Sequence, residues 1–153
     1  MRNRQGRLTH GHLVGGKQTA EYRAWRGIVQ RCCNPNAANY ARFGGSGVEL
    51  DPRWRNFSDF LKDVGPKPSS KHSIGRIFDL PRYAKGFAVW QTQRQQSLHK
   101  MSRHFFEGKV KGWSNRRFNT VVKFITKVVA DAPDTEPTEF QILEHLYRQP
   151  EAA

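Results

Sequence analysis

The sequence predicts a small, mainly helical α+β domain built around a short strand–strand–helix unit, with a helical extension at its carboxyl end. Apolar residues recur at three- and four-residue spacing in several separate stretches, which is typical of amphipathic helices. Between these stretches lie two short apolar runs, His72–Phe78 and Gly86–Trp90, followed by a long polar segment that favours a helix. At 153 residues, the chain has room for one domain and an appendage.

The chain is strongly basic, and its charge is unevenly distributed. It contains 26 Lys and Arg against 13 Asp and Glu, a formal net charge of +13. Residues 131–153 hold six of the acids and a single base, Arg148, so residues 1–130 carry 25 bases, 7 acids and a net charge of +18. An excess of that size is typical of a protein that binds a polyanion, and nucleic acid is the polyanion we expect.

Cysteine usage and hydropathy exclude several classes of protein. Cys32 and Cys33 are adjacent and are the only cysteines, so a disulfide framework and a four-cysteine zinc site are both excluded. No apolar run approaches the roughly 18 residues of a membrane span, and the first residues lack the apolar core of a secretory signal. We therefore expect a cytoplasmic protein without membrane attachment.

The amino-terminal third predicts an arm and a helix. Residues 1–18 are rich in Arg, Gly and His and poor in apolar residues, so we expect a flexible basic arm that lies on phosphates when nucleic acid is bound. A first helix is expected from Thr19, a good N-cap, to Cys33. Pro35 and the residue before it end this helix.

A glycine-rich turn, a short strand and a second helix are expected next. Gly44–Gly47 favours a tight turn before a strand at Val48–Leu50. Because no Lys-Ser or Lys-Thr follows these glycines, they do not indicate a nucleotide-binding P-loop. The second helix is expected at Phe57–Val64, with Asn56 as its N-cap and Gly65 at its end.

The central unit and the extension complete the chain. After the two apolar runs, Thr92 is a suitable N-cap for a helix that continues to about residue 103. In the extension, Ser114 caps a helix that runs to about Ala130, and an acidic helix is expected at Thr138–Tyr147. Either this pair packs back on the core, or residues 114–149 form a homodimer or partner interface. The expected division is an arm (1–18), a nucleic-acid-binding domain (19–104) and an extension (105–153).

Residues 19–100 carry a dense set of motifs in which the chain resembles small phage and prophage proteins related to the HNH homing endonucleases. The matching positions are Thr19, Glu21, Tyr22, Trp25, Arg31, Cys32, Asn34, Pro35, Asn36, Tyr40, Phe43, Gly44, Gly45, Gly47, Val48, Arg53, Trp54, Phe57, Phe60, Leu61, Asp63, Gly65, Pro66, Pro68, His72, Ser73, Ile74, Arg76, Ile77, Tyr83, Trp90, Thr92 and Gln96. The resemblance implies a ββα unit that holds one divalent cation and cuts DNA. It also implies a bacterial host cell and association with the nucleoid.

The chain departs from this family where the resemblance implies the metal ligands. Gly75 and Phe78 stand at the two acidic positions of the first strand, and Phe87 stands at the asparagine of the second. A hard divalent cation requires oxygen ligands, which glycine and phenylalanine side chains lack. We therefore expect a scaffold that has lost its metal site, has no cofactor and no catalytic residue, and binds DNA in preference to RNA with little sequence selectivity.

Two alternatives stay open. If the ligands have moved, the chain is an active HNH-type endonuclease or nickase that uses Mg²⁺ or another divalent cation, and His72, Asp79 and His99 are the candidate catalytic residues. The chain could instead be a phage inhibitor or a ribonucleoprotein component that binds RNA or a protein partner, because basic and aromatic residues suit RNA as well as DNA.

The expected nucleic-acid contacts are basic side chains that lie off the apolar stripes or within the central unit. Arg76 keeps the arginine of the family motif and lacks the acidic neighbour, so we expect it to contact a phosphate. The full set is Arg23, Arg26, Arg31, Arg53, Arg55, Lys71, Arg76, Arg82, Arg94, Lys100 and Arg103.

Overall fold

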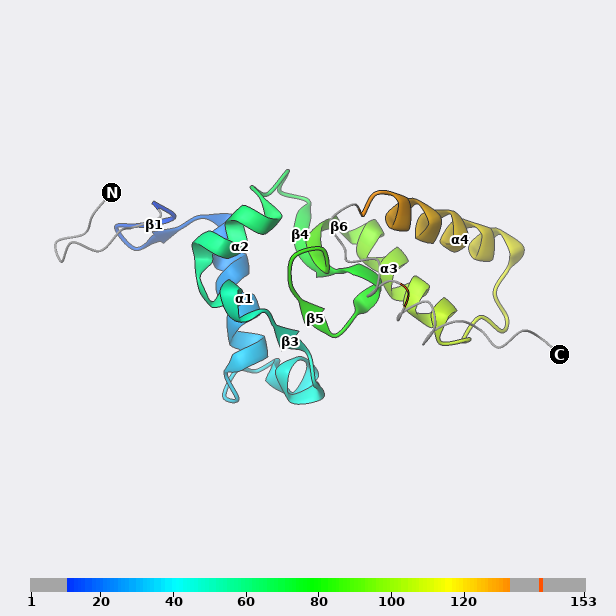
Figure 1. Cartoon of the computed structure of the whole chain (residues 1–153), viewed down its shortest axis with the longest axis horizontal. Coiled ribbons are helices and arrows are strands. Elements are labelled where there is room, and N and C mark those ends of the chain that lie inside the picture. The colour runs from blue at the N-terminus through cyan, green and yellow to red at the C-terminus, as the bar shows by residue number, and fades with distance from the viewer. Residues whose placement is uncertain (1–10, 133–140, 142–153) are drawn as a thin grey trace.

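The computed structural model describes residues 11–132 and residue 141, and these form a small α+β domain (Figure 1). Helices α1 and α2 lie at one end of the molecule, α3 and α4 lie at the other, and the strands β4 and β6 lie between them (Figure 1). The helices are α1 (Ala20–Cys33), α2 (Phe57–Val64), α3 (Gln93–Phe106) and α4 (Asn115–Ala130), with 3-10 turns η1 (Tyr40–Arg42), η2 (Gly44–Ser46), η3 (Pro52–Arg55) and η4 (Ile77–Asp79). The strands are β1 (Leu13–Val14), β2 (Lys17–Gln18), β3 (Glu49–Leu50), β4 (His72–Arg76), β5 (Arg82–Tyr83) and β6 (Ala88–Thr92).

The helix starts follow the signals in the sequence. Thr19, Asn56, Thr92 and Ser114 are the N-caps of α1, α2, α3 and α4, and each side chain accepts a hydrogen bond from a backbone N–H in the first turn. At Thr92 the cap is reciprocal, because the Gln95 side chain accepts a hydrogen bond from the Thr92 backbone N–H. These caps satisfy donors that a helix start would otherwise leave without partners.

The centre of the molecule has the predicted strand–strand–helix order. β4 and β6 pair antiparallel, with His72 opposite Thr92 and Arg76 opposite Ala88, and α3 begins directly after β6. The expectation that the first strand continues to Phe78 was wrong, because the chain turns into η4 after Arg76.

The η4 turn places Phe78 and Asp79 in the left-handed region, with φ of 50° and 55°. Aspartate tolerates this region, whereas a bulky residue such as phenylalanine rarely adopts it. Contacts with α3 hold Phe78 there: its backbone N–H donates to Nδ1 of His99 at 3.0 Å, and its ring lies 5.2 Å from that of Phe106. Helix α3 therefore fixes the shape of the turn that follows β4.

Two hydrophobic clusters meet at the ββα unit. The first contains Trp54, Phe57 and Phe60 from the η3–α2 region and Ile28 from α1, packed against Ile74 of β4. The second joins η4 and the loop before β6 to α3 and α4, and its members are Ile77, Phe78, Leu80, Ala84 and Phe87, with Phe106, Phe124, Ile125 and Val128 packed against them. Because side chains alternate along a strand, Ile74 faces the first cluster and Gly75 faces α3.

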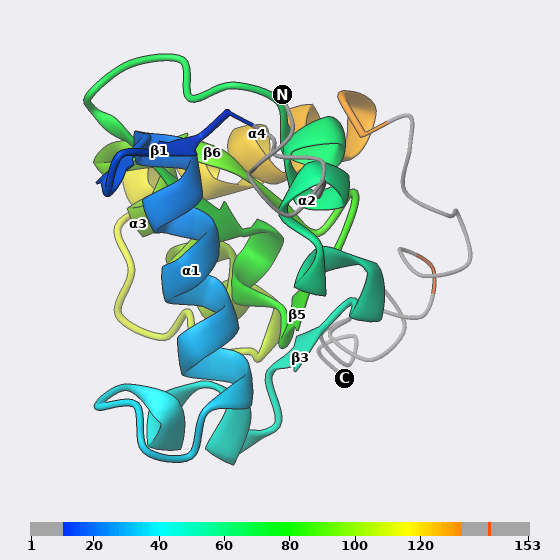
Figure 2. The same ribbon diagram turned by 90° about the vertical axis from the view of Figure 1, so that its left-hand side faces the viewer.

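Two features of the structure differ from the layout expected along the chain. Residues 11–18, expected to belong to a flexible arm, form the β1–β2 hairpin, and the Thr19 N–H donates to the His12 carbonyl at 3.1 Å (Figure 2). The boundary expected after residue 104 falls inside α3, which ends at Phe106. The remainder of the arm, residues 1–10, lies outside the described residues.

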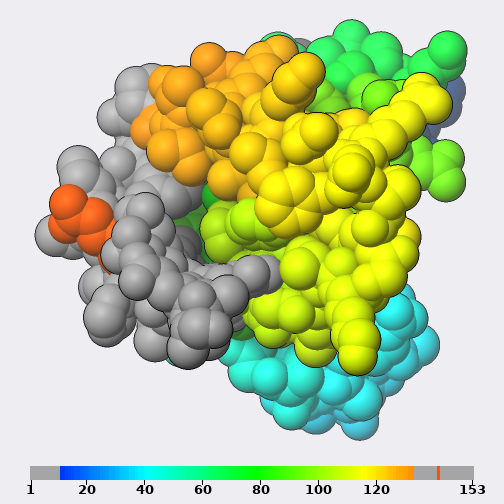
Figure 3. Space-filling model, turned by 90° about the vertical axis from the view of Figure 1, so that its right-hand side faces the viewer, coloured from blue at the N-terminus to red at the C-terminus, as the bar shows by residue number. Residues whose placement is uncertain are grey.

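The described part of the extension packs against the rest of the chain. Val121 of α4 is fully buried, and α3 and α4 lie side by side in the space-filling view (Figure 3). The helix expected at Thr138–Tyr147 lies, apart from Gln141, outside the described residues. Among the described helices, none combines the length and the apolar character that crossing a bilayer requires.

Candidate nucleic-acid interface

A cleft of about 370 Å³ lies between the end of α1, the β4–β6 pair and α3. We call it the basic cleft, because it is lined by Arg31 from α1, Arg76 from β4 and Lys100 from α3. Its other lining residues are mostly polar, and they are Phe43, Ile74, Gly75, Asp79, Tyr83, Gln91, Gln93, Gln96, Ser97 and His99. The β4–β6 pairing and α3 thus bring together cations that are separated by up to 69 positions in the sequence.

Two guanidinium groups share the same pair of aromatic rings at one wall of the basic cleft. The Cζ atom of Arg31 lies 5.1 Å from the centre of the Phe43 ring and 6.0 Å from that of Tyr83. The Cζ atom of Arg76 lies 5.6 Å and 5.7 Å from the same two rings. Each cation is attracted to the ring faces, but the two positive charges also repel each other. The arrangement therefore concentrates positive charge at this wall of the basic cleft.

The two arginines differ in their partners. Arg31 donates from Nε to the carbonyl of Gly27 at 3.0 Å, and it has no carboxylate partner among the described residues. The Arg76 side chain is only 12% exposed and donates to the Asp79 carboxylate at 2.9 Å and to the Leu80 carbonyl at 2.9 Å. Burial raises the pKa of Tyr83, and the charges of Arg31 and Arg76 act in the opposite direction. The uncompensated positive charge at this wall is therefore that of Arg31.

Asp79 is shared between two arginines. One of its oxygens accepts from Arg76, and the other lies 3.4 Å from Nη1 of Arg103, which also pairs with Glu107 at 2.7 Å. A carboxylate held by two guanidinium groups must break those contacts before it can bind a metal cation. Asp79 therefore acts in this structure as the centre of an ion-pair network.

The side chain of Gln91 fills the space beside Gly75. Gln91 is 2% exposed, and a Cβ atom added to Gly75 would lie 2.8 Å from Cδ of Gln91 and closer still to its Oε1. A carboxylate at position 75 would therefore need the volume that this amide occupies. The Nε2 atom of Gln91 is buried and has no hydrogen-bond partner within the part of the chain that the structure describes, and a buried donor without a partner is costly.

Of the three candidate catalytic residues, Asp79 and His99 both line the basic cleft, and His72 lies apart from them. His72 lies at the opposite end of β4 from Arg76, about 13 Å away at the usual rise of a strand, and its Nδ1 hydrogen-bonds to the Ser69 hydroxyl at 2.7 Å. His99 is 5% exposed, and burial lowers its pKa to about 4 against the smaller opposing effect of Asp79. Because its Nδ1 accepts the Phe78 N–H, the neutral ring carries its proton on Nε2.

The described residues also offer no cluster of metal ligands. Within residues 11–132 and 141, no three His, Cys, Asp or Glu side chains lie together in a way that could hold an ion. Phe87, at the position where the resemblance implies a ligand, is 9% exposed and belongs to the second hydrophobic cluster. Position 87 therefore contributes to packing in this fold.

The structure brings together only some of the expected nucleic-acid contacts. Arg31, Arg76 and Lys100 line the basic cleft, and Arg103 adjoins it through Asp79. The other expected contacts do not line this cleft. Arg23, Arg26 and Lys71 are exposed, and Arg94 lines a second cavity. Three have partners elsewhere: Arg53 pairs with Asp51 and Asp63, Arg55 contacts Cys33, and Arg82 lies over the Phe87 ring. Sequence reasoning missed the roles of Phe43 and Tyr83, because no local pattern connects them to the two arginines.

Comparisons of the chain with protein-family models, with curated proteins and with solved structures find no match. The residues and their geometry are therefore the basis on which a function can be assigned.

Proposed function

We propose that the protein binds nucleic acid, with DNA preferred over RNA, through the basic cleft and the cations around it. The observation that carries this proposal is that the guanidinium groups of Arg31 and Arg76 both lie over the rings of Phe43 and Tyr83. Arg31 has no carboxylate partner among the described residues. A phosphate accepts hydrogen bonds from a guanidinium group and would compensate the charge of Arg31, which no carboxylate among the described residues does. The net charge of +18 over residues 1–130 supports the same class of ligand.

The cleft favours contact with the backbone of the nucleic acid over contact with its bases. Phosphate contacts fix the position of a protein on nucleic acid but carry no direct sequence information. The cations of the cleft are suited to such contacts, so binding is sequence-tolerant.

The scaffold is that of an HNH-type nuclease of phage or prophage origin whose metal site has been lost. The order β4, β6, α3 agrees with the ββα unit that the resemblance implies. Three features support the loss of the metal site: the Gln91 amide occupies the space beside Gly75, Phe87 is buried in an apolar cluster, and two arginines hold Asp79. The protein therefore holds nucleic acid without hydrolysing it.

Fluorescence anisotropy tests the binding proposal. Labelled duplex DNA, single-stranded DNA and a structured RNA are titrated with the full chain over a series of KCl concentrations. The Arg31→Gln variant should weaken binding to all sequences alike and reduce the slope of log K against log salt by about 1. Arg53→Gln is the matched control, because Asp51 and Asp63 already compensate that charge at 3.3 and 3.2 Å. Equal effects of the two variants, or no binding to any ligand, would overturn the proposal.

Two further measurements test the loss of the metal site and the preference for DNA over RNA. Incubation of supercoiled plasmid with the protein and Mg²⁺, Mn²⁺ or Zn²⁺ should leave the plasmid intact, and cleavage that a chelator abolishes would refute the loss of the metal site. If RNA binds more tightly than DNA at every salt concentration, the preferred ligand is RNA.

A further inference from the structure

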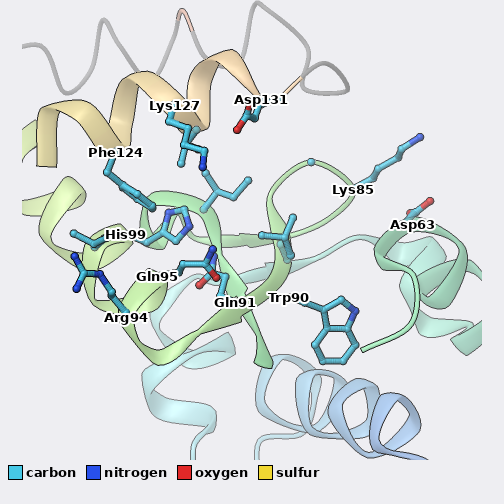
Figure 4. Close-up of a pocket in the computed structure, with 17 residues that line it drawn as sticks. Asp63, Lys85, Trp90, Gln91, Arg94, Gln95, His99, Phe124, Lys127 and Asp131 are labelled. Carbon is cyan, nitrogen blue, oxygen red and sulfur yellow. The ribbon is translucent and has the colours of Figure 1, made fainter. Parts of the chain in front are cut away.

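A second cavity, of about 520 Å³, lies between β6, α3 and α4, and we call it the helical groove (Figure 4). Phe124 and Lys127 point from α4 toward His99 and Gln91, and the rings of Phe124 and His99 lie 4.8 Å apart (Figure 4). Val89, Leu98 and Val128 contribute apolar surface, and Val89 is 37% exposed although it is a large hydrophobic residue. The groove thus leaves apolar side chains open to a partner.

The polar groups of the helical groove favour an acidic partner. Its cations are Lys85, Arg94 and Lys127, and its acids are Asp63 and Asp131. Gln91 lies at the wall of the groove, and its buried Nε2 has no hydrogen-bond partner among the described residues, so a small movement of this amide would give a donor to a carbonyl or carboxylate oxygen. An apolar wall with a basic rim and an unused donor is complementary to an acidic segment with apolar side chains.

We propose that the helical groove binds the chain's own carboxyl-terminal sequence, residues 133–153. Asp131 and Ala132 themselves line the groove, so the sequence that follows starts at the groove wall. Residues 133–153 contain five acids against one base, and their apolar residues, Phe140, Leu143, Leu146 and Tyr147, recur at three- and four-residue spacing. Covalent attachment through a short connection gives an effective concentration in the millimolar range, so a contact that is weak in isolation is occupied.

This contact has a consequence for nucleic-acid binding. Acids placed over Arg94 and Lys127 reduce the positive potential beside the basic cleft, so the bound segment weakens the attraction of phosphates. This consequence rests on the proposed function, whereas the contact between the groove and residues 133–153 does not.

Zero-length carbodiimide cross-linking of the full chain, followed by mass spectrometry of the monomer band, tests the contact. Cross-links are expected from Lys85 or Lys127 to Glu139 or Glu144. Val89→Glu places a charge on the apolar wall and should reduce the yield of these cross-links about tenfold, because the bound segment would no longer bury a valine side chain there. Val129→Glu is the matched control, because Val129 is 47% exposed on α4 and does not line the groove.

A second variant leaves the groove intact. Leu143→Asp with Leu146→Asp keeps both glutamates and should reduce the cross-link yield as Val89→Glu does, and it should tighten DNA binding. The proposal would be overturned if no cross-links form, if Val89→Glu and Val129→Glu give equal yields, or if the cross-links occur only in a dimer band. A dimer band would show that the segment binds a second copy of the chain. Cross-links that behave as expected in a chain that binds no nucleic acid would refute the proposed function and leave the groove contact standing.

Discussion

Gly75→Ala tests whether the Gln91 side chain fills the space beside β4. Gly75 is not among the residues with positive φ, so alanine fits its backbone. The added methyl group would lie 2.8 Å from Cδ of Gln91, a side chain that is 2% exposed and must move to make room. Overpacking of this kind costs about 1–3 kcal/mol, and alanine recovers about 0.5–1 kcal/mol by restricting the unfolded chain. The expected net loss of unfolding free energy is roughly 1–2 kcal/mol.

The sign of the effect should reverse when Gln91 is shortened. In a Gln91→Ala background the methyl group of Gly75→Ala meets no obstacle from this side chain, so the substitution should stabilise by about 0.5–1 kcal/mol. The two sites should therefore show an interaction energy of about 2 kcal/mol in a double-mutant cycle. Urea unfolding of the four proteins, followed by tryptophan fluorescence, measures this energy.

Gly44→Ala is the control for this cycle. Its methyl group would lie 2.8 Å from the backbone carbonyl carbon of Cys32, which cannot rotate away as a side chain can. Gly44→Ala should therefore destabilise the protein equally with and without Gln91→Ala. If Gly75→Ala costs the same in both backgrounds, Gln91 does not occupy the space beside position 75, and the packing described for the basic cleft is wrong.

Two other substitutions probe α3. Burial lowers the pKa of His99 to about 4, whereas a histidine in an unfolded chain titrates near 6.5. His99 is therefore neutral in both states above pH 6.5. Between pH 6.5 and 4 only the unfolded chain gains this proton, so the free energy of unfolding falls by roughly 3 kcal/mol as the pH is lowered. His99→Gln keeps an acceptor for the Phe78 N–H and should reduce this fall in urea unfolding measured across that window; an unchanged slope would contradict the assigned burial. Thr92→Ala removes the N-cap of α3 and should lower the free energy of unfolding by about 1 kcal/mol. Ser97→Ala, on the exposed face of the helix, is the control and should leave it nearly unchanged. Equal thermal midpoints for the two variants would show that the cap contributes nothing.

The helices could be predicted because their ends depend on local chemistry. Asn56 and Gly65 bound α2 at the positions expected from the sequence, and Ser114 begins α4 as expected. An N-cap contacts a backbone N–H only two or three residues away, so the information lies within one turn. The β1–β2 hairpin was not predicted, because the composition of residues 11–18 shows only that they are poor in core residues. Composition cannot show one specific contact with a distant residue, such as that between the rings of His12 and Phe57 at 5.0 Å.

The basic cleft could be predicted only in part, because its geometry depends on distant pairs of residues. Arg76 was expected to contact phosphate, but its position beside Arg31 arises from packing across 45 positions of sequence. The left-handed conformation of Phe78 likewise depends on His99, 21 positions away. No window of sequence contains both members of such a pair, so periodicity and propensity give no signal for them.

Gln91 and His99 line both the basic cleft and the helical groove, so the two cavities share a wall. Because one side chain has one amide, two ligands that both accepted a hydrogen bond from Gln91 would compete for the same donor. Thermodynamic linkage makes the exchange reciprocal: the factor by which a first ligand changes the affinity for a second is the factor by which the second changes the affinity for the first. A ligand that contacts this shared wall in one cavity and a ligand that contacts it in the other would therefore change each other's affinity by the same factor.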